Sequence, residues 1–201
     1  MRDGLHDLRR AGRVLAIGCD EVFLATHLAE YAAEVTVLDT SAGQLGHLAR
    51  RYPEINFLRH HPAQPLPFAA GVFDAIWCGE ILDRVFNPAA VLSEVYRVLG
   101  PAGRLMATVA DDGAAQRATF AAEAPVAAER PCLRRFTRGG LVRLVRQAGF
   151  AHLRTASGRA GPRAAGAPRR LLLRARKVAA GGATALGRRD ELAQGSRLRA
   201  A

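Results

Sequence analysis

The sequence predicts a doubly wound α/β fold, in which helices cover both faces of a mostly parallel sheet. Short apolar runs without polar alternation recur along residues 13–110, as expected of parallel strands that are buried on both faces. Segments with apolar residues at helical spacing separate most of these runs. An alternation of strand and helix in this order is typical of a doubly wound sheet.

The first part of the chain supplies three strands and two helices to this prediction. Strands are expected at 13–18, 34–39 and 55–61, and helices at 20–33 and 41–52. The first strand ends in Gly and the other two are rich in β-branched or large apolar residues, which favour strands. The order is therefore β-α-β-α-β.

The second part continues the same order. Strands are expected at 73–79, 103–110 and 151–157, and helices after Asn87 and after Thr137. Asn and Thr are favoured N-cap residues, and a Gly follows each of the two helical patterns as a stop signal. These local signals predict both ends of each helix.

The proposed domain boundaries follow from composition. Residues 1–160 are expected to form the folded domain, and 161–195 an Arg/Ala/Gly-rich insertion or extension that is partly helical or disordered, with a short helix at 169–180. Residues 196–201 are a candidate last strand of the same domain. The Ala-rich connection 111–132 is longer than compact domains usually contain without a use such as a lid.

Length and cysteine usage limit the class of protein. The 201 residues, 49% of them hydrophobic, suffice for one domain with a full core. No run approaches the roughly 20 apolar residues of a membrane span, and the N-terminus has no apolar export segment, so a cytoplasmic location is expected. Cys19, Cys78 and Cys132 are widely spaced, which predicts reduced thiols and neither a disulfide framework nor a metal site.

The net charge of +11 is distributed unevenly along the chain. Residues 1–130 carry 12 Arg against 16 Asp and Glu, whereas 131–201 carry 17 Arg and Lys against 2 acids. The basic segment 168–180 is a candidate amphipathic helix for a membrane surface, an acidic carrier protein or nucleic acid. No aromatic residue lies among its Arg residues for base stacking, so nucleic acid is disfavoured. A solvated or partly disordered insertion remains the alternative.

The candidate binding site lies where the first two strands end. Ligands of doubly wound sheets bind beyond the C-terminal ends of the strands, which is the expected position of Gly18 and Asp39. A carboxylate 21 residues after the Gly is placed to accept both ribose hydroxyls of an adenosine. The alternative for Asp39 is an N-cap of the helix that opens near Ser41.

The charge of the first loop selects the other half of the ligand. Asp20 and Glu21 follow the first strand, where a pyrophosphate would have to bind. A phosphate charge about 4 Å from a carboxylate costs on the order of 4 kcal/mol at an effective dielectric of 20. A pyrophosphate is therefore disfavoured as the ligand at this position. S-adenosylmethionine is favoured, because its sulfonium and ammonium groups are positively charged. Alternatively, both acids complement the dipole of the following helix.

Five motifs in register identify the family that the chain resembles. They resemble those of the class I S-adenosylmethionine-dependent methyltransferases of the small-molecule type, and they read VLAIGC, VTVLDTSAGQL, PLPFAAGVFDAIWCGEIL, LSEVYRVLGPAGRL and FTRGGLVRLVRQAGF. The match covers about residues 13–150. It implies a Rossmann-like, seven-stranded sheet whose last strand is antiparallel. It also implies methyl transfer to an O, N or C atom of a small metabolite, without a metal.

The resemblance also implies a set of cofactor contacts. The residues expected to bind S-adenosylmethionine are Gly18, Cys19, Asp20, Asp39, Thr40, Ala63, Gln64 and Cys78. Candidate catalytic residues are Glu80, Asp83 and Arg84, which follow the fourth strand; capping or solvation of a helix start is the alternative for all three. Cys78 is expected to be a small core residue that lines the pocket rather than a nucleophile.

The chain departs from the family pattern at several site positions. Ala16 stands where the family has an acid, Asp20 and Val22 replace glycines, Pro62 replaces the Asp that reads the adenine, and Ala102 replaces a turn Gly. The N-terminal segment is too short for the helical cover of many relatives, so a protein partner is one way to complete the site. The leading interpretation is a small-molecule methyltransferase, and the alternative is a non-catalytic protein of that fold with lost or weakened cofactor binding.

Overall fold

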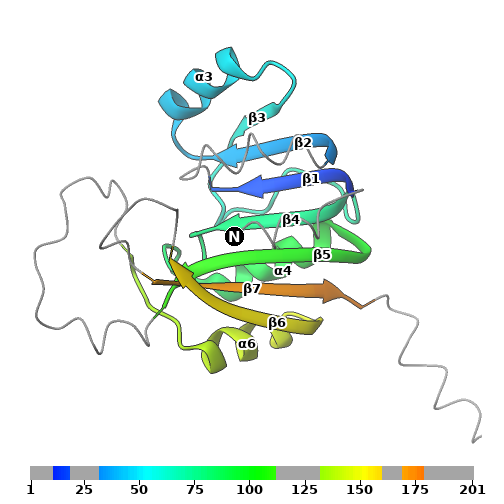
Figure 1. The fold of residues 1–201 in the computed structure, drawn as a ribbon. Helices are drawn as coiled ribbons and strands as arrows, with labels where there is room; N and C mark the ends of the chain where they lie inside the picture. Colours follow the sequence, from blue (N-terminus) through cyan, green and yellow to red (C-terminus); the bar gives the residue numbers. More distant parts are fainter. Residues whose placement is uncertain (1–10, 19–31, 112–131, 160–168, 179–201) are drawn as a thin grey trace, which may run out of the picture.

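The structure is a computed structural model that describes residues 11–18, 32–111, 132–159 and 169–178 (Figure 1). The elements within these residues are, in chain order, β1 (Ala11–Ile17), β2 (Ala32–Asp39), α3 (Ala42–Arg51), β3 (Asn56–Arg59), β4 (Phe73–Gly79), α4 (Pro88–Val98), β5 (Leu99–Ala110), α6 (Arg138–Gln147), β6 (Phe150–Arg159) and β7 (Arg169–Lys177). Each strand predicted at 13–18, 34–39, 55–61, 73–79, 103–110 and 151–157 is present, although several ends shift by one or more residues.

The strands form one seven-stranded sheet in the order β3-β2-β1-β4-β5-β7-β6. The pairs among β1 to β5 are parallel, and β7 runs antiparallel to both of its neighbours, β5 and β6. The prediction of a Rossmann-like, mostly parallel, seven-stranded sheet with an antiparallel last strand is confirmed. The chain order reverses between β1 and β4, which is the switch point where ligands bind in such sheets.

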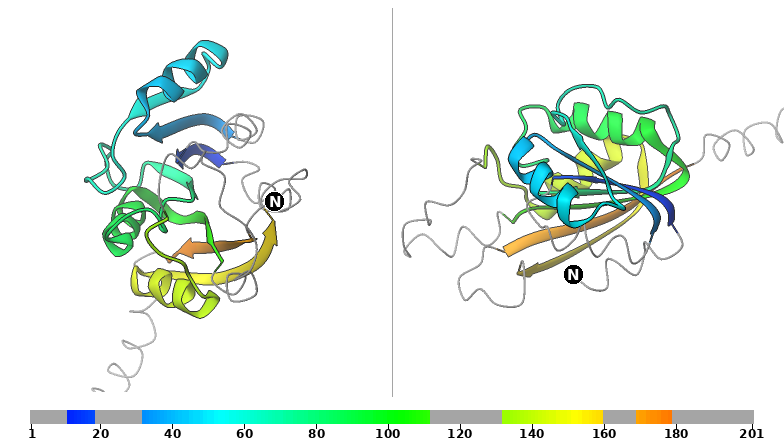
Figure 2. Two further views of the ribbon diagram at one scale, coloured as in Figure 1. Left: turned by 90° about the vertical axis from the view of Figure 1, so that its left-hand side faces the viewer. Right: turned by 90° about the horizontal axis from the view of Figure 1, so that it is seen from above.

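Alternating residues of the strands supply the two faces of the core. Leu15 and Ile17 of β1 pack in one cluster with the buried residues of α4 and α6. The two helices lie on the same side of the sheet (Figure 2). We call the opposite side the α3 face, because its cluster contains the α3 residues Leu45 and Leu48. On that face lie Val14, Ala16, Val35, Val37, Ala75, Trp77 and Met106.

The helix ends follow the local signals of the sequence. Asn87 Oδ1 accepts a hydrogen bond from the Ala90 N–H at 3.1 Å, and Thr137 Oγ1 accepts one from the Gly140 N–H at 3.1 Å. Gly149 has φ +95°, which suits a residue that ends a helix. Both predicted N-caps are therefore confirmed.

The helix expected at 169–180 is wrong for residues 169–177, which form β7 in the sheet. Leu171, Leu173 and Ala175 are buried against the α4 and α6 side, whereas Leu172 and Arg174 between them are only partly buried and Arg176 is exposed. This burial has the period of two residues of a strand, and the unbroken Leu run concealed it. The predicted extension 161–195 therefore contributes an interior strand, between β5 and β6, to the sheet.

Other predictions lie outside the described residues. They include most of the helix at 20–33, whose last two residues belong to β2, nearly all of the connection 111–132, and the strand at 196–201. Among the described helices, none is long and apolar enough to cross a membrane.

Candidate functional site

The C-terminal ends of β1, β2 and β4 meet at the switch point of the sheet. Ile17, the last residue of β1, lies opposite Leu38 of β2 and Cys78 of β4. The next residue, Gly18, donates its N–H to the Leu38 carbonyl at 3.0 Å. Gly18, Asp39 and Gly79 therefore come together at one edge of the sheet, as the sequence predicts for the first two.

Gly18 occupies a position that only glycine fits. Its φ of +89° is in the region that L side chains rarely adopt. A Cβ added to Gly18 would lie 2.4 Å from the Gly79 carbonyl oxygen and 3.0 Å from the Ile81 side chain. The backbone that leaves β1 at Gly18 is therefore held close to the end of β4.

Asp39 ends β2 with a buried carboxylate, which is 2% exposed. Its Oδ1 accepts a hydrogen bond from the Ser41 N–H at 2.8 Å. The N-cap of α3 is Ser41, whose hydroxyl accepts from the Gln44 N–H, so Asp39 does not have the capping role considered as its alternative. A carboxylate at the end of this strand is the kind of acceptor that binds the hydroxyls of a ribose.

The segment after β3 is tied to the same edge. The His60 N–H donates to the Asp39 carbonyl at 2.9 Å, and the His60 ring nitrogen Nε2 lies 3.1 Å from the Pro65 carbonyl oxygen. Ala63 and Gln64 are exposed in the turn between them, and their N–H groups donate to His61, to Nδ1 and to the carbonyl respectively. Ala63 and Gln64, two of the residues expected to bind the cofactor, thus lie on backbone that is tied to the end of β2.

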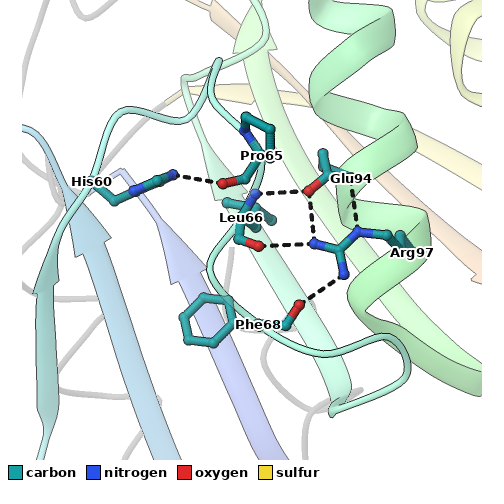
Figure 3. A network of polar contacts seen from close by, with 6 residues as sticks. All are labelled: His60, Pro65, Leu66, Phe68, Glu94 and Arg97. Carbon is teal, nitrogen blue, oxygen red and sulfur yellow. Dashed lines mark hydrogen bonds and ion pairs between the residues drawn. The ribbon is translucent and has the colours of Figure 1, made fainter.

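Glu94 and Arg97 of α4 clamp the next few residues of this segment (Figure 3). Arg97 donates to the carbonyl oxygens of Leu66 at 2.8 Å and Phe68 at 2.7 Å. Glu94 Oε2 accepts from the Leu66 N–H at 2.7 Å and from Arg97 Nη2 at 2.7 Å. The clamp fixes the backbone that follows Ala63 and Gln64.

The two charges of the clamp favour each other's ionised form. The hydrogen bond from Arg97, with a smaller contribution from the Leu66 N–H, holds the pKa of Glu94 below its usual value. The same hydrogen bond raises the pKa of Arg97. Sequence reasoning missed this pair as a site element. Its only signal was the position of Glu94 and Arg97 in the family-like word LSEVYRVLGP.

The three candidate catalytic residues lie after β4, and two of them form ion pairs with each other. Glu80 is 7% exposed and has φ +51°. Its Oε2 lies 2.8 Å from Arg84 Nη2, and its Oε1 lies 2.7 Å from Nη2 of Arg170 in β7. Glu80 thus joins its own loop to the last strand of the sheet, a contact that the sequence did not predict.

Asp83, the third candidate, holds the same loop in place through its side chain and its carbonyl oxygen. It is 1% exposed, and its Oδ2 accepts from the Ala110 N–H at 2.9 Å. Its carbonyl oxygen accepts from the N–H groups of Leu133 and Arg134. The loop forms turns rather than the start of a helix, so the alternative of helix capping is wrong for these residues.

Cys78 is a core residue. Its side chain is fully buried, and this burial raises the pKa of the Cys78 thiol to about 12. The thiol is therefore neutral at physiological pH and is not a nucleophile. Among the described residues, no group of three His, Cys, Asp or Glu is placed to hold a metal ion. Cys19 and Asp20, two of the expected cofactor contacts, lie outside the described residues.

Residues 15–107 match a family model described as a methyltransferase domain. The chain is 33% identical over 96 residues to a probable S-adenosylmethionine-dependent methyltransferase of Mycolicibacterium smegmatis, covering 47% of this chain and 37% of that one. It is 36% identical over 98 residues to a demethylmenaquinone methyltransferase of Beutenbergia cavernae, covering 49% and 40%. The chain thus matches about two fifths of the length of these curated relatives.

Solved structures share the fold at lower identity. A [4+2]-cyclase, SpnF, superposes with a TM-score of 0.68 at 21% identity, covering 88% of this chain and 79% of that one. An N-methyltransferase of Burkholderia thailandensis, solved with 1,6-didemethyltoxoflavin and S-adenosylhomocysteine, has a TM-score of 0.64 at 23% identity, covering 87% and 74%. At these identities the likeness establishes the fold alone.

Proposed function

We propose that the chain, whose residues 15–107 match the methyltransferase-domain model, is a class I S-adenosylmethionine-dependent methyltransferase that transfers a methyl group from that cofactor to a small metabolite. The acceptor atom is O, N or C. When bound, the cofactor supplies an electrophilic methyl group on its sulfonium. The protein supplies binding and orientation.

The adenosine half of the cofactor fits the described edge. Asp39 accepts the ribose hydroxyls, and the backbone at Gly18 approaches the ligand without a side chain between them. Thr40, Ala63 and Gln64 border the adenine, on backbone that the Glu94–Arg97 clamp holds in place. The observation that carries the proposal is the meeting of a Gly without room for Cβ and a buried strand-end carboxylate at the switch point.

The acceptor side constrains the chemistry. Glu80 is held by Arg84 and Arg170, and Asp83 by the Ala110 N–H, so both carboxylates are engaged in structural contacts rather than directed at an acceptor as a general base. Methyl transfer often needs only alignment of the two reactants, which alone lowers the barrier substantially. We therefore expect acceptors that are nucleophilic near neutral pH without a base, such as carboxylates, aromatic amines, or phenols and quinols whose own substituents lower their pKa. The names of the curated relatives include enzymes of quinone biosynthesis, which supports a quinol among them.

A second candidate function is a non-catalytic binding protein built on this fold. The specific observation in its favour is the engagement of all three candidate catalytic residues in structural contacts. Ala16, where the family has an acid, is likewise packed in the core beside Val37 and Trp77. One structural neighbour, SpnF, is a [4+2]-cyclase, so the fold also serves reactions other than methyl transfer.

A transfer assay separates the two functions. Methyl-labelled S-adenosylmethionine is incubated with the protein and a panel of quinols, phenols, amines and carboxylates, and both labelled product and S-adenosylhomocysteine are measured. The methyltransferase proposal expects stoichiometric formation of both with at least one acceptor class, and loss of both in Asp39→Asn. Cofactor binding without turnover on any class would favour the binding protein instead.

A further inference from the structure

A hollow of about 350 Å³ lies on the sheet where β5, β7 and β6 are neighbours. Its charged lining consists of four arginines and one histidine: Arg104 from β5, Arg174 and Arg176 from β7, and Arg154 and His152 from β6. Met106 also lines it, so the hollow opens on the α3 face. No Asp or Glu is among the described residues that line it.

The strand register places these arginines in pairs. Arg104 lies directly opposite Arg176 across β5 and β7, and Arg154 lies directly opposite Arg174 across β6 and β7. Directly opposite residues of antiparallel strands have Cβ atoms about 5 Å apart. The guanidinium groups of each pair can therefore reach the same ligand.

Like charges directly opposite each other on a sheet are destabilising. Elsewhere in the described residues, Arg13, Arg84, Arg97 and Arg170 form ion pairs with carboxylates. No carboxylate of the described residues forms an ion pair with Arg104, Arg154 or Arg176. Several positively charged side chains that line one hollow favour the binding of an anion there.

His152 adds a fifth donor through a backbone irregularity. It has φ +52° and lies at the register shift between Ala151 and Arg154 in the pairing of β6 with β7. A bulge of this kind re-aims a side chain, and here the His152 side chain joins the lining of the hollow.

The hollow is separate from the candidate cofactor edge. Arg104 precedes Ala110, the last residue of β5, by six positions, which is about 20 Å along a strand. The cofactor edge lies at the C-terminal ends of the parallel strands, and the hollow lies toward the other end of β5. A ligand of the hollow is therefore distinct from S-adenosylmethionine.

We propose that this hollow binds a ligand through two neighbouring phosphate groups, one at each cross-strand arginine pair. The planar fork of Arg matches phosphate oxygens with two parallel hydrogen bonds, which a single carboxylate or chloride uses less well. No aromatic residue is among the described residues that line the hollow, so these residues offer a nucleobase no stacking platform and the phosphates carry the recognition. The volume suits a small ligand or the backbone of a short single strand.

Titration calorimetry with two probes, inorganic diphosphate and a single-stranded oligothymidine, tests the proposal on the full chain. The test variant is Arg104→Gln with Arg176→Gln, and the matched control is Arg143→Gln with Arg146→Gln, which removes the same charge from exposed positions of α6. We expect diphosphate to bind the parent and the control alike. The Kd of the test variant should rise at least about tenfold, because the Arg104–Arg176 pair loses its charge-assisted hydrogen bonds to the phosphate.

Each outcome decides the proposal. Diphosphate binding that only the test variant loses supports a free phosphorylated metabolite. Oligothymidine binding with the same variant sensitivity, without diphosphate binding, supports phosphate recognition with a nucleic-acid backbone as its source. Absence of binding by both probes, or equal weakening in test and control variants, overturns it. The test variant should melt at or above the parent temperature, since it removes like-charge repulsion, so lost binding cannot be ascribed to unfolding.

Discussion

Replacing Arg97 with Met removes the guanidinium that joins α4 to the segment after β3, and it keeps most of the apolar stem. The carbonyl oxygens of Leu66 and Phe68 then lose a charged donor at 2.8 and 2.7 Å, and Glu94 loses its partner. The backbone beside the expected adenine contacts should become looser as a result. Both the stability of the domain and its affinity for the cofactor should fall.

The magnitude follows from the contacts. A hydrogen bond to a charged group contributes about 1.5–3 kcal/mol, but the Arg97 side chain is 36% exposed, so water replaces part of what is lost. We expect a loss of about 2–3 kcal/mol in the free energy of unfolding. For a chain of this size that corresponds to a fall of roughly 4–12 °C in melting temperature.

Differential scanning calorimetry of parent, Arg97→Met and Arg143→Met measures this effect. Arg143 is exposed on α6, so its replacement should change the free energy of unfolding by no more than about 0.5 kcal/mol. A melting temperature of Arg97→Met within about 2 °C of the parent would refute the clamp as a stabilising contact.

Three further predictions concern single residues. Ala102 has φ +58°, so Ala102→Gly should relieve backbone strain of about 1–2 kcal/mol, which exceeds the entropic cost of the added Gly. The midpoint of unfolding in guanidinium chloride should therefore rise, and a lower midpoint contradicts this. The pKa of Glu94 is lowered in the folded state, so its stabilising contribution is present above the ordinary value of 4.5 and is lost as pH falls through the folded value. The difference in unfolding free energy between parent and Glu94→Gln should therefore shrink from pH 7 to pH 3, and a constant difference would be inconsistent with it. Cys78, with a buried thiol of pKa about 12, should be alkylated by iodoacetamide only after unfolding, whereas exposed Cys132 should react in the native protein. Peptide mass spectrometry measures the labelling, and equal labelling of Cys78 and Cys132 in the native protein argues against the burial of Cys78.

Local signals made most elements predictable. The strand expected at 73–79 is β4 with the same bounds, and Asn87 and Thr137 cap their helices, because each depends on residues next to it in the chain. β7 was not predictable in this way. Its segment of consecutive leucines is compatible with a helix, and only its pairing with β5 and β6 in the sheet, with β5 partners sixty or more residues away, makes it a strand.

The same distinction applies to the candidate site. Gly18 and Asp39 were predictable, since a parallel strand carries its ligand residues to its C-terminal end. The contacts from Arg97 to Leu66 and from Arg170 to Glu80 were not, because each joins residues far apart in the sequence. Those contacts turn Glu80 from a candidate base into part of a fixed loop, which changes the chemistry expected of the site.

The central claim is that the edge at Gly18 and Asp39 binds S-adenosylmethionine. Isothermal titration of S-adenosylmethionine and S-adenosylhomocysteine into parent, Asp39→Asn and Glu34→Gln tests it most directly. Glu34 is an exposed acid of β2 that pairs with Arg13, so its variant removes the same charge away from the site.

The account predicts saturable heat for the parent and for Glu34→Gln. The affinity of Asp39→Asn should fall at least about tenfold, because a charged acceptor of the ribose hydroxyls is lost. No heat from the parent at millimolar cofactor, or equal affinity in Asp39→Asn and the parent, would contradict the assignment of this edge as the cofactor site.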